Sequence, residues 1–272
     1  MKTLSGAHVH TQFCDGRNTA EEMVLSALAH GFVSLGFSSH AAQPFDERYA
    51  PSHEEPYRQE IARLREKYRA RMPIYLGIER DYYSIADPAR YDYFIGSVHY
   101  LSDGDKRVPV DGKPEELREY VDACCGGSGL LAARRYYERL SEYARALPPA
   151  IIGHFDLIRK NNPKLMLFDE NNTAYRALAL DALCSMRGLG ALLEVNTGGM
   201  ARGYLPSPYP ALFLLKAWKE WGERVILNAD CHRAPLIAYA FDEAEEYIRA
   251  AGFKTAVRLG SGREKWEEYS LL

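Results

Sequence analysis

Two histidines separated by one residue, His8 and His10, lie near the start of the sequence, and Asp15 follows five residues after the second. If this segment is a β-strand, side chains two positions apart lie on one face, so both imidazoles point to the same place. Two imidazoles and a carboxylate are suitable ligands for zinc, iron or manganese. The same spacing also arises by chance in ordinary strands, so it indicates a metal site only where further ligands join the pair.

Further residues of the same types occur at or just after the ends of short apolar segments; they are His40, Glu79, His99, His154, Asp230 and His232. For each histidine alone, a hydrogen bond to a carbonyl group or a helix cap is the ordinary alternative. Six imidazoles and three carboxylates in one place would be costly unless cations neutralised the carboxylates and used the ring lone pairs. The whole set therefore predicts a multinuclear metal site. His30, on a predicted helix, and His53, in a polar loop, are left outside it.

The elements that must position these residues are seven short apolar segments, predicted to be strands at 4–10, 32–38, 73–78, 93–98, 150–153, 191–195 and 224–229. Helical patterns alternate with them, the first opened by a capping box of Thr19 and Glu22 and closed by Gly31. The later ones cover 54–71, 114–147 with a break at 126–129, 171–187, 211–221 and 238–251. The segment from 100 to about 113 is predicted to be a loop, and no element is assigned from Lys254 onward.

This alternation predicts a parallel sheet covered on both faces, in which the carboxyl ends of the strands share one mouth. All nine candidate ligands would then meet there. No repeat, long linker or shift of composition divides the chain, so the simplest arrangement is a single α/β domain over residues 1–272, closed or nearly closed as a barrel.

The amino-acid composition limits the classes of binding partner that we expect for this chain. The chain has 272 residues, 34 Lys and Arg against 37 Asp and Glu, and a net charge of −3, which gives no general basic field for nucleic acid. A small molecule is the expected partner. The start, Met1 to Gly6, lacks the apolar region of a signal peptide, and no apolar run is long enough to cross a membrane, so we expect a cytoplasmic protein without a membrane partner. Five cysteines without a C-x-x-C pair are expected to be reduced thiols, and oligomeric state is not predicted.

Taken together, the motifs resemble those of the PHP family, the polymerase and histidinol phosphatase phosphoesterases. The matching segments are His8-Val9-His10 with Asp15, Ser39-His40, Gly77-Ile78-Glu79, Gly96-Ser97-Val98-His99, Gly153-His154, Glu194-Val195-Asn196-Thr197 and Asp230-Cys231-His232. The resemblance implies a distorted (β/α)7 TIM-like barrel, with the metal site at the C-terminal ends of its strands. It also implies two or three divalent metal ions, and imidazole and carboxylate ligands accept zinc, iron and manganese alike.

The resemblance further implies how the ligands are shared among the ions. A first ion would be bound by His8, His10, Glu79 and Asp230, a second by Glu79, His99 and His154, and a third by Asp15, His40 and His232. Glu79 would bridge two of the ions.

Clustered divalent ions favour attack of hydroxide on phosphorus, so the expected reaction is hydrolysis of a phosphomonoester. Arg159, five residues after His154, and Arg202, six after Asn196, could bind the phosphate, although by position alone each could equally be a solvated surface charge. Similarity of the segments 154–160 and 196–204 to the histidinol-phosphatase branch of the family favours phosphate binding. His232 and Asp230 are candidates for protonating the leaving group, although both are also predicted metal ligands.

The branch similarity implies hydrolysis of L-histidinol phosphate to L-histidinol and phosphate in histidine biosynthesis. Hydrolysis of another small phosphomonoester or of a nucleic-acid end is the alternative within this chemistry, and a non-catalytic metal-stabilised module is the alternative outside it. The chain departs from the branch in two places. Proline usually stands where this chain has Ala42 or Gln43, which concerns the fit of the substrate, and Cys231 is expected to be a small packing residue.

Overall fold

A computed structural model describes residues 4–46 and 53–272. Its centre is a sheet in which seven parallel strands follow one another in sequence order. They are β1 (Leu4–Gly6), β2 (Phe32–Phe37), β3 (Ile74–Asp81), β4 (Tyr93–Ser97), β7 (Ile151–Ile152), β8 (Leu192–Asn196) and β9 (Val225–Asn228). The seven predicted strands and their parallel pairing are confirmed. Met1–Thr3, used above to argue against a signal peptide, lie outside the described residues.

Two further pieces of sheet were not predicted. The unassigned tail forms β10 (Thr255–Leu259), parallel to β9, and β11 (Trp266–Ser270), antiparallel to β10. The segment predicted as a loop contains an antiparallel hairpin of β5 (Tyr100–Asp103) and β6 (Lys106–Pro109), so the prediction was wrong for 100–109, whereas 110–113 form a loop. Of the Asp and Gly residues that suggested a loop, Gly104 and Asp105 form its two-residue turn and Asp111 and Gly112 follow β6, while Leu101 and Val108 are buried opposite each other.

The helices follow the predicted pattern. They are α1 (Ala20–Ala29), α2 (Glu54–Tyr68), α3 (Pro114–Cys124), α4 (Gly129–Ala146), α6 (Thr173–Cys184), α8 (Leu212–Glu220) and α9 (Phe241–Ala250), with short helices α5 (Asn162–Leu165) and α7 (Gly198–Ala201) in loops. The capping box of α1 is confirmed, since Thr19 Oγ1 accepts from the Glu22 N–H and the Glu22 carboxylate accepts from the Thr19 N–H. None of the described helices combines the length and apolar character that a membrane span requires.

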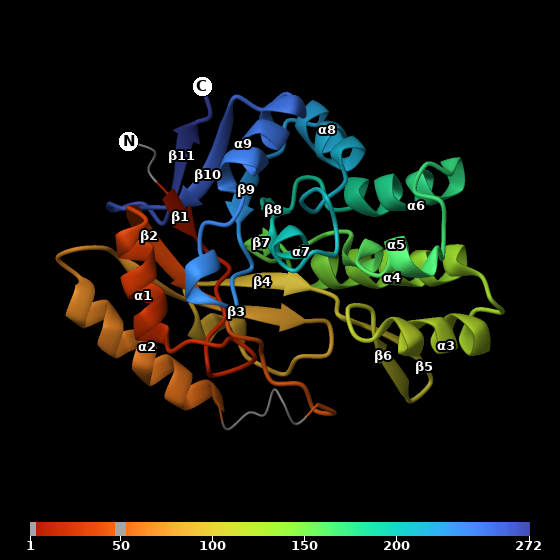
Figure 1. The fold of residues 1–272 in the computed structure, drawn as a ribbon, viewed down its shortest axis with the longest axis horizontal. Helices are drawn as coiled ribbons and strands as arrows, with labels where there is room; N and C mark the ends of the chain where they lie inside the picture. Colours follow the sequence, from red (N-terminus) through yellow and green to blue (C-terminus); the bar gives the residue numbers. More distant parts are fainter. Residues whose placement is uncertain (1–3, 47–52) are drawn as a thin grey trace.

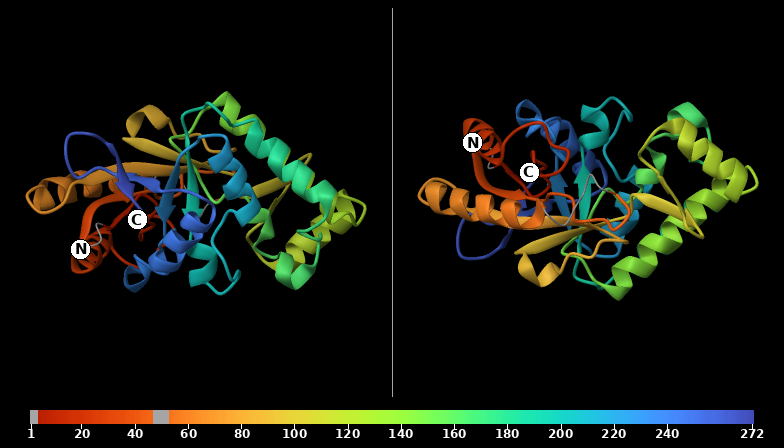
Figure 2. Two further views of the ribbon diagram at one scale, coloured as in Figure 1. Left: turned by 90° about the horizontal axis from the view of Figure 1, so that it is seen from above. Right: turned by 90° about the horizontal axis from the view of Figure 1, so that it is seen from below.

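Helices surround the sheet (Figure 1). The red and orange α1 and α2 lie at one end, the green α3, α4 and α6 at the other, and the blue α8 and α9 between them, as Figure 2 also shows. One apolar core lies between sheet and helices, with Leu35, Ile78 and Trp218 fully buried. A second core fills the inner side of the sheet, with Tyr93, Ile95, Ile151, Leu192, Ile226 and Val257 among its members. Because apolar side chains fill the interior, the loops at the strand ends are left for polar chemistry.

The first and seventh strands meet at their carboxyl ends. Val9 forms a parallel bridge with Cys231, in which the His10 N–H donates to Cys231 O (2.9 Å) and the Cys231 N–H donates to His8 O (3.0 Å). Elsewhere, Ser34 Oγ of β2 donates to the carbonyl oxygen of Leu259, the last residue of β10 (2.6 Å). The bridge between Val9 and Cys231 places His8 and His10 beside Asp230 and His232.

Candidate metal centre

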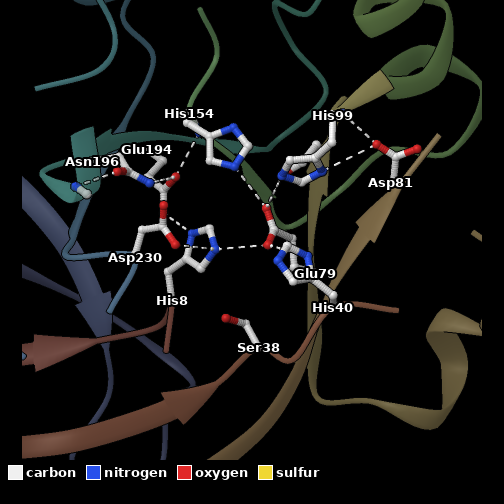
Figure 3. Close-up of polar contacts among 12 residues, drawn as sticks. His8, Ser38, His40, Glu79, Asp81, His99, His154, Glu194, Asn196 and Asp230 are labelled. Atoms are coloured by element: carbon white, nitrogen blue, oxygen red, sulfur yellow. Dashed lines mark hydrogen bonds and ion pairs between the residues drawn. The ribbon is translucent and has the colours of Figure 1, made fainter. Parts of the chain in front are cut away.

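Glu79, in β3, lies at the centre of the predicted ligands and is 1% exposed. Its carboxylate oxygens lie 2.9–3.4 Å from ring nitrogens of five histidines, which are His8, His10, His40, His99 and His154. These histidines come from four different strand ends or the loops that follow them (Figure 3). Ser97 Oγ donates to Glu79 Oε1 (2.7 Å) and fixes the carboxylate. The structure thus brings together residues that the sequence places in separate βα units.

Two more carboxylates complete the cluster. Asp230 Oδ1 lies 3.4 Å from His10 Nε2 and 3.6 Å from His8 Nε2. Asp15 Oδ1 lies 3.2 Å from His232 Nε2 and 3.6 Å from His40 Nε2. Asp230 is buried, whereas the side chain of Asp15 is 43% exposed, so the cluster extends from the interior to the solvent.

Four groups of these residues have ligand atoms close enough to share an ion, all within 4.8 Å of one another. They are His10–Asp15–His40–His232, His8–His10–Asp230, His8–Glu79–His154 and His40–Glu79–His99. The groups contain all nine predicted ligands and no other residue. The predicted third set stays together with His10 added, whereas His99 and His154 of the predicted second set fall in different groups. The assignment of residues to individual ions therefore stays a prediction.

Buried atoms without hydrogen bonds support a cation in this place. His8 Nε2, His10 Nε2 and Glu79 Oε2 are buried and have no hydrogen-bond partner within residues 4–46 and 53–272, yet the Glu79 oxygen lies 3.2 Å from the His8 nitrogen and 3.4 Å from the His10 nitrogen. A buried polar atom without a partner costs free energy, and a metal ion bound by all three would remove that cost. The residues present therefore fit divalent metal ions.

The pKa values of the clustered side chains also favour a bound cation. Burial, together with His232 and His40, lowers the pKa of His10 to about 3, so this ring is neutral and can donate a lone pair. Burial opposes ionisation of Glu79, but the surrounding histidines outweigh it and hold the pKa of Glu79 well below its usual range. Burial also lowers the pKa of His8, but Glu194, Glu79 and Asp230 together raise it, so this position attracts either a proton or a metal ion.

Glu194 and Asp81 contact the sides of His8 and His99 that face away from the cluster, and so orient these candidate ligands. Glu194, fully buried, receives four hydrogen bonds: from the ring of His8 (2.7 Å), the His154 N–H (2.8 Å), Asn196 Nδ2 (2.8 Å) and Asn228 Nδ2 (2.9 Å). Asp81 accepts from the His99 N–H (2.6 Å) and lies 3.3 Å from His99 Nδ1. A carboxylate on Nδ1 leaves Nε2 free to bind metal, so each positions one histidine. The sequence showed Glu194 only as part of a motif, and it gave no signal for Asp81.

Arg202 lies beside the candidate metal ligands, and its role in phosphate binding stays a prediction. Its Nη2 donates to Asp230 Oδ2 (2.7 Å), and its side chain, 33% exposed, lines the pocket. A Cβ at Gly198 would lie 2.7 Å from both atoms of this pair, so only glycine fits there. Asp230 itself has a left-handed backbone (φ 48°), an unfavourable conformation that directs its carboxylate into the cluster.

Arg159 is placed differently from Arg202. It does not line the pocket, and its guanidinium is buried in ion pairs with Asp156 (3.0 Å) and Glu170 (2.7 Å). Its neighbour Lys160 lines the pocket instead. A direct contact between Arg159 and substrate stays a prediction that these ion pairs do not support.

The pocket above the cluster has a volume of about 400 Å³. Besides seven of the predicted ligands and Arg202, its lining includes Arg17, Gln43, Asp111, Lys160 and Arg233. Gln43 Oε1 is buried without a hydrogen-bond partner in the described part of the chain, so the position that departs from the family branch contributes an acceptor near the pocket. Apart from Gln43, which was noted as a departure from the branch, none of these residues was predicted, because single polar residues in loops carry no spacing signal. Within the described part of the chain, His30 and His53 belong to no candidate metal group, and Cys231 is buried between the candidate ligands Asp230 and His232.

Comparison with known proteins identifies the family that this fold and cluster define. The PHP domain matches residues 7–198, most of the chain, and the protein belongs to the PHP-domain family. The match includes every predicted ligand except Asp230 and His232, which lie beyond it.

Relatives are similar over almost their whole length. A Deinococcus radiodurans protein named "Probable histidinol-phosphatase" is 30% identical over 94% of this chain and 96% of its own, and the histidinol-phosphatase of Bacillus subtilis is 26% identical over 86% and 96%. Among solved structures, hisK from Listeria monocytogenes has a TM-score of 0.76 at 20% identity, covering 88% of this chain and 99% of its own. Histidinol phosphate phosphatase from Lactococcus lactis, complexed with zinc, L-histidinol and phosphate, has a TM-score of 0.65 at 20% identity, covering 94% and 97%. At this identity, the solved structures establish the shared fold.

Proposed function

We propose that the protein is a metal-dependent phosphatase that hydrolyses L-histidinol phosphate to L-histidinol and inorganic phosphate, a reaction of histidine biosynthesis. The observation that carries this proposal is the convergence of six histidines and three carboxylates under a pocket of small-molecule size. The full-length relatives named histidinol-phosphatase favour this substrate over another phosphomonoester. The net charge of −3 gives no support to a nucleic-acid substrate.

The metal ions would be held by the nine predicted ligands, His8, His10, Asp15, His40, Glu79, His99, His154, Asp230 and His232. We propose two or three divalent ions of zinc, iron or manganese, a choice that imidazole and carboxylate ligands leave open. When bound, such ions activate water as a nucleophile and neutralise phosphate oxygens. Zinc in the Lactococcus lactis relative supports this ligand chemistry.

Arg202 and His232 would have different roles in the reaction, the first in binding phosphate and the second in protonating the leaving group. Arg202 faces the pocket and can bind a phosphate oxygen while Asp230 holds its guanidinium in place. Of the two candidate proton donors, His232 is the better one, because its side chain is 21% exposed at the pocket wall and Asp230 is 6% exposed and paired with Arg202. That pairing and the nearby histidines hold the pKa of Asp230 well below its usual range despite burial, which disfavours a protonated carboxyl group.

We also propose that the sheet is a distorted (β/α)7 barrel of one domain. Support comes from the bridge between Val9 and Cys231, which joins the first and seventh strands, and from the apolar core on the inner side of the sheet. A barrel places all the strand ends around one mouth, as the ligand cluster requires.

Phosphate release tests the function directly. Protein stripped with a chelator and reloaded with zinc, manganese or iron(II) is assayed with L-histidinol phosphate and a panel of other phosphomonoesters. We expect the stripped protein to stay folded and inactive, and the reloaded protein to prefer L-histidinol phosphate. Preference for another ester would refute the substrate, and unfolding without metal together with inactivity after reloading would favour a structural metal site.

A further inference from the structure

Asp111 is a pocket carboxylate without a part in the metal cluster. Four carboxylates line the pocket, namely Asp15, Glu79, Asp111 and Asp230. Three of them belong to candidate metal groups, and within residues 4–46 and 53–272 Asp111 belongs to none. A carboxylate in this position is therefore available for a different ligand.

The backbone around Asp111 is held firmly beside the cluster. The Val110 N–H donates to His99 O (2.8 Å), and Asn161 Nδ2 donates to both Val110 O (3.1 Å) and Gly112 O (3.2 Å). Lys160 Nζ donates to the backbone carbonyl of Asp111 (2.6 Å). Because the segment is fixed on both sides, little ordering is needed when a ligand binds its side chain.

The Asp111 side chain itself is open to a ligand. It is 33% exposed, and its closest cation, Lys160 Nζ, lies 3.5 Å from Oδ2, which is an ion pair without a hydrogen bond. Burial raises the pKa of Asp111, but Lys160, His99 and His154 outweigh it and lower the pKa, so the group stays ionised. An ionised carboxylate with unused acceptor sites can receive charge-assisted hydrogen bonds from a cation.

We propose that Asp111 binds the ammonium group of the substrate and so selects phosphomonoesters whose alcohol part is cationic. The inference rests on the proposed function, because L-histidinol phosphate carries a primary amine that is protonated at neutral pH. The remaining charged residues of the pocket wall are Arg17, Lys160, Arg202 and Arg233, which suit the phosphate and repel an ammonium group. A substrate charged oppositely at its two ends would therefore be oriented with its phosphate at the metal cluster and Arg202 and its amine at Asp111.

The test compares Asp111→Asn with wild type on three substrates: L-histidinol phosphate, its analogue without the amino group, and p-nitrophenyl phosphate. We expect kcat/KM for L-histidinol phosphate to fall about tenfold or more, mainly through KM, because a charge-assisted contact becomes a neutral one. For the two substrates without an ammonium group, kcat/KM should stay within about twofold. Asp105→Asn, in the exposed turn between β5 and β6, is the matched control and should change nothing.

An equal loss on all three substrates would overturn the proposal and assign Asp111 to metal or phosphate binding, as would a lower metal content of the variant. Unchanged kinetics on L-histidinol phosphate would overturn it as well. Wild-type protein that hydrolyses p-nitrophenyl phosphate but not L-histidinol phosphate would instead refute the proposed function, a result that the variant does not affect.

Discussion

Two glutamates, Glu79 and Glu21, each contact several potentially cationic side chains, in opposite environments. Glu79 is 1% exposed and is surrounded by histidines at the strand ends (Figure 3). Glu21 lies on α1 with its side chain 27% exposed, where it contacts Arg63 (2.8 Å), Lys67 and the Tyr68 hydroxyl (2.7 Å) of α2. Clusters of several charged contacts around one carboxylate thus occur both in the buried interior and at the solvent-exposed surface.

The two glutamates differ in the groups that solvate their charge. At the surface, water solvates each charge before and after pairing, so the Glu21 network contributes little to stability. In the interior, the carboxylates of Glu79 and Asp230 and the rings around them lose that solvation, and a bound cation would provide a partner for Glu79 Oε2, His8 Nε2 and His10 Nε2. The comparison teaches that burial, rather than the number of charged contacts, marks the functional cluster.

The largest effect is expected from Glu79→Gln. The amide keeps the shape of the side chain but loses the charge that faces five histidines, so metal content should fall and kcat/KM should decrease by roughly 10³-fold or more. Elemental analysis and phosphate release measure the two quantities. Glu21→Gln is the matched control. A Glu79→Gln protein with full metal content and activity within tenfold of wild type would refute the conclusion that burial marks the functional cluster.

A second buried charge, Arg159, should show its effect in stability. Arg159→Met leaves Asp156, which is fully buried, without its ion pair, and we expect the free energy of unfolding to fall by about 3 kcal/mol. Urea denaturation measures this loss, and Arg134→Met, on the exposed face of α4, is the control. If stability were unchanged while KM for the substrate rose, Arg159 would be a substrate contact, as the sequence predicted.

Glu194→Gln tests the residues behind the ligands. All four groups that contact Glu194 are donors, so an amide NH₂ group would face two of them, in either orientation, and would disturb His8 or His154. We expect metal affinity to weaken by about 10–100-fold, measured by competition with a chelator. Unchanged affinity would show that Glu194 supports the fold alone.

The smallest effect is expected from Glu21→Gln itself, with activity unchanged and the midpoint of thermal unfolding lowered by about 2 °C or less. Its partners Lys67, Arg63 and Tyr68 lower the pKa of Glu21 from 4.5 to about 2. A lowered pKa adds stability above pH 4.5 that disappears as the pH falls toward 2. The difference from wild type should therefore be constant between pH 7 and about 5 and narrow below it, as melting curves across this range would show. A large loss of thermal stability at pH 7 would contradict the conclusion that the exposed Glu21 network contributes little to stability.

Much of the fold was predictable because it depends on local patterns. Short apolar runs identified seven strands, Thr19 and Glu22 identified the start of α1, and the glycines after Cys125 separated α3 from α4. The hairpin of β5 and β6 was missed because turn residues lie at its centre and after its end. The strands β10 and β11 were missed because their sequence has mixed polarity.

By itself, the sequence determined which residues could bind metal, since ligand types at the carboxyl ends of parallel strands must converge wherever those strands form one sheet. Only the tertiary structure decided how they are divided among candidate groups and what supports them. It placed Glu194 behind His8, Asp81 behind His99, and Asp111 in the pocket, and it turned Arg159 inward toward Asp156 while Arg202 faced the cluster. The physical reason is that these contacts join distant segments, and their geometry depends on side-chain packing that has no period in the sequence.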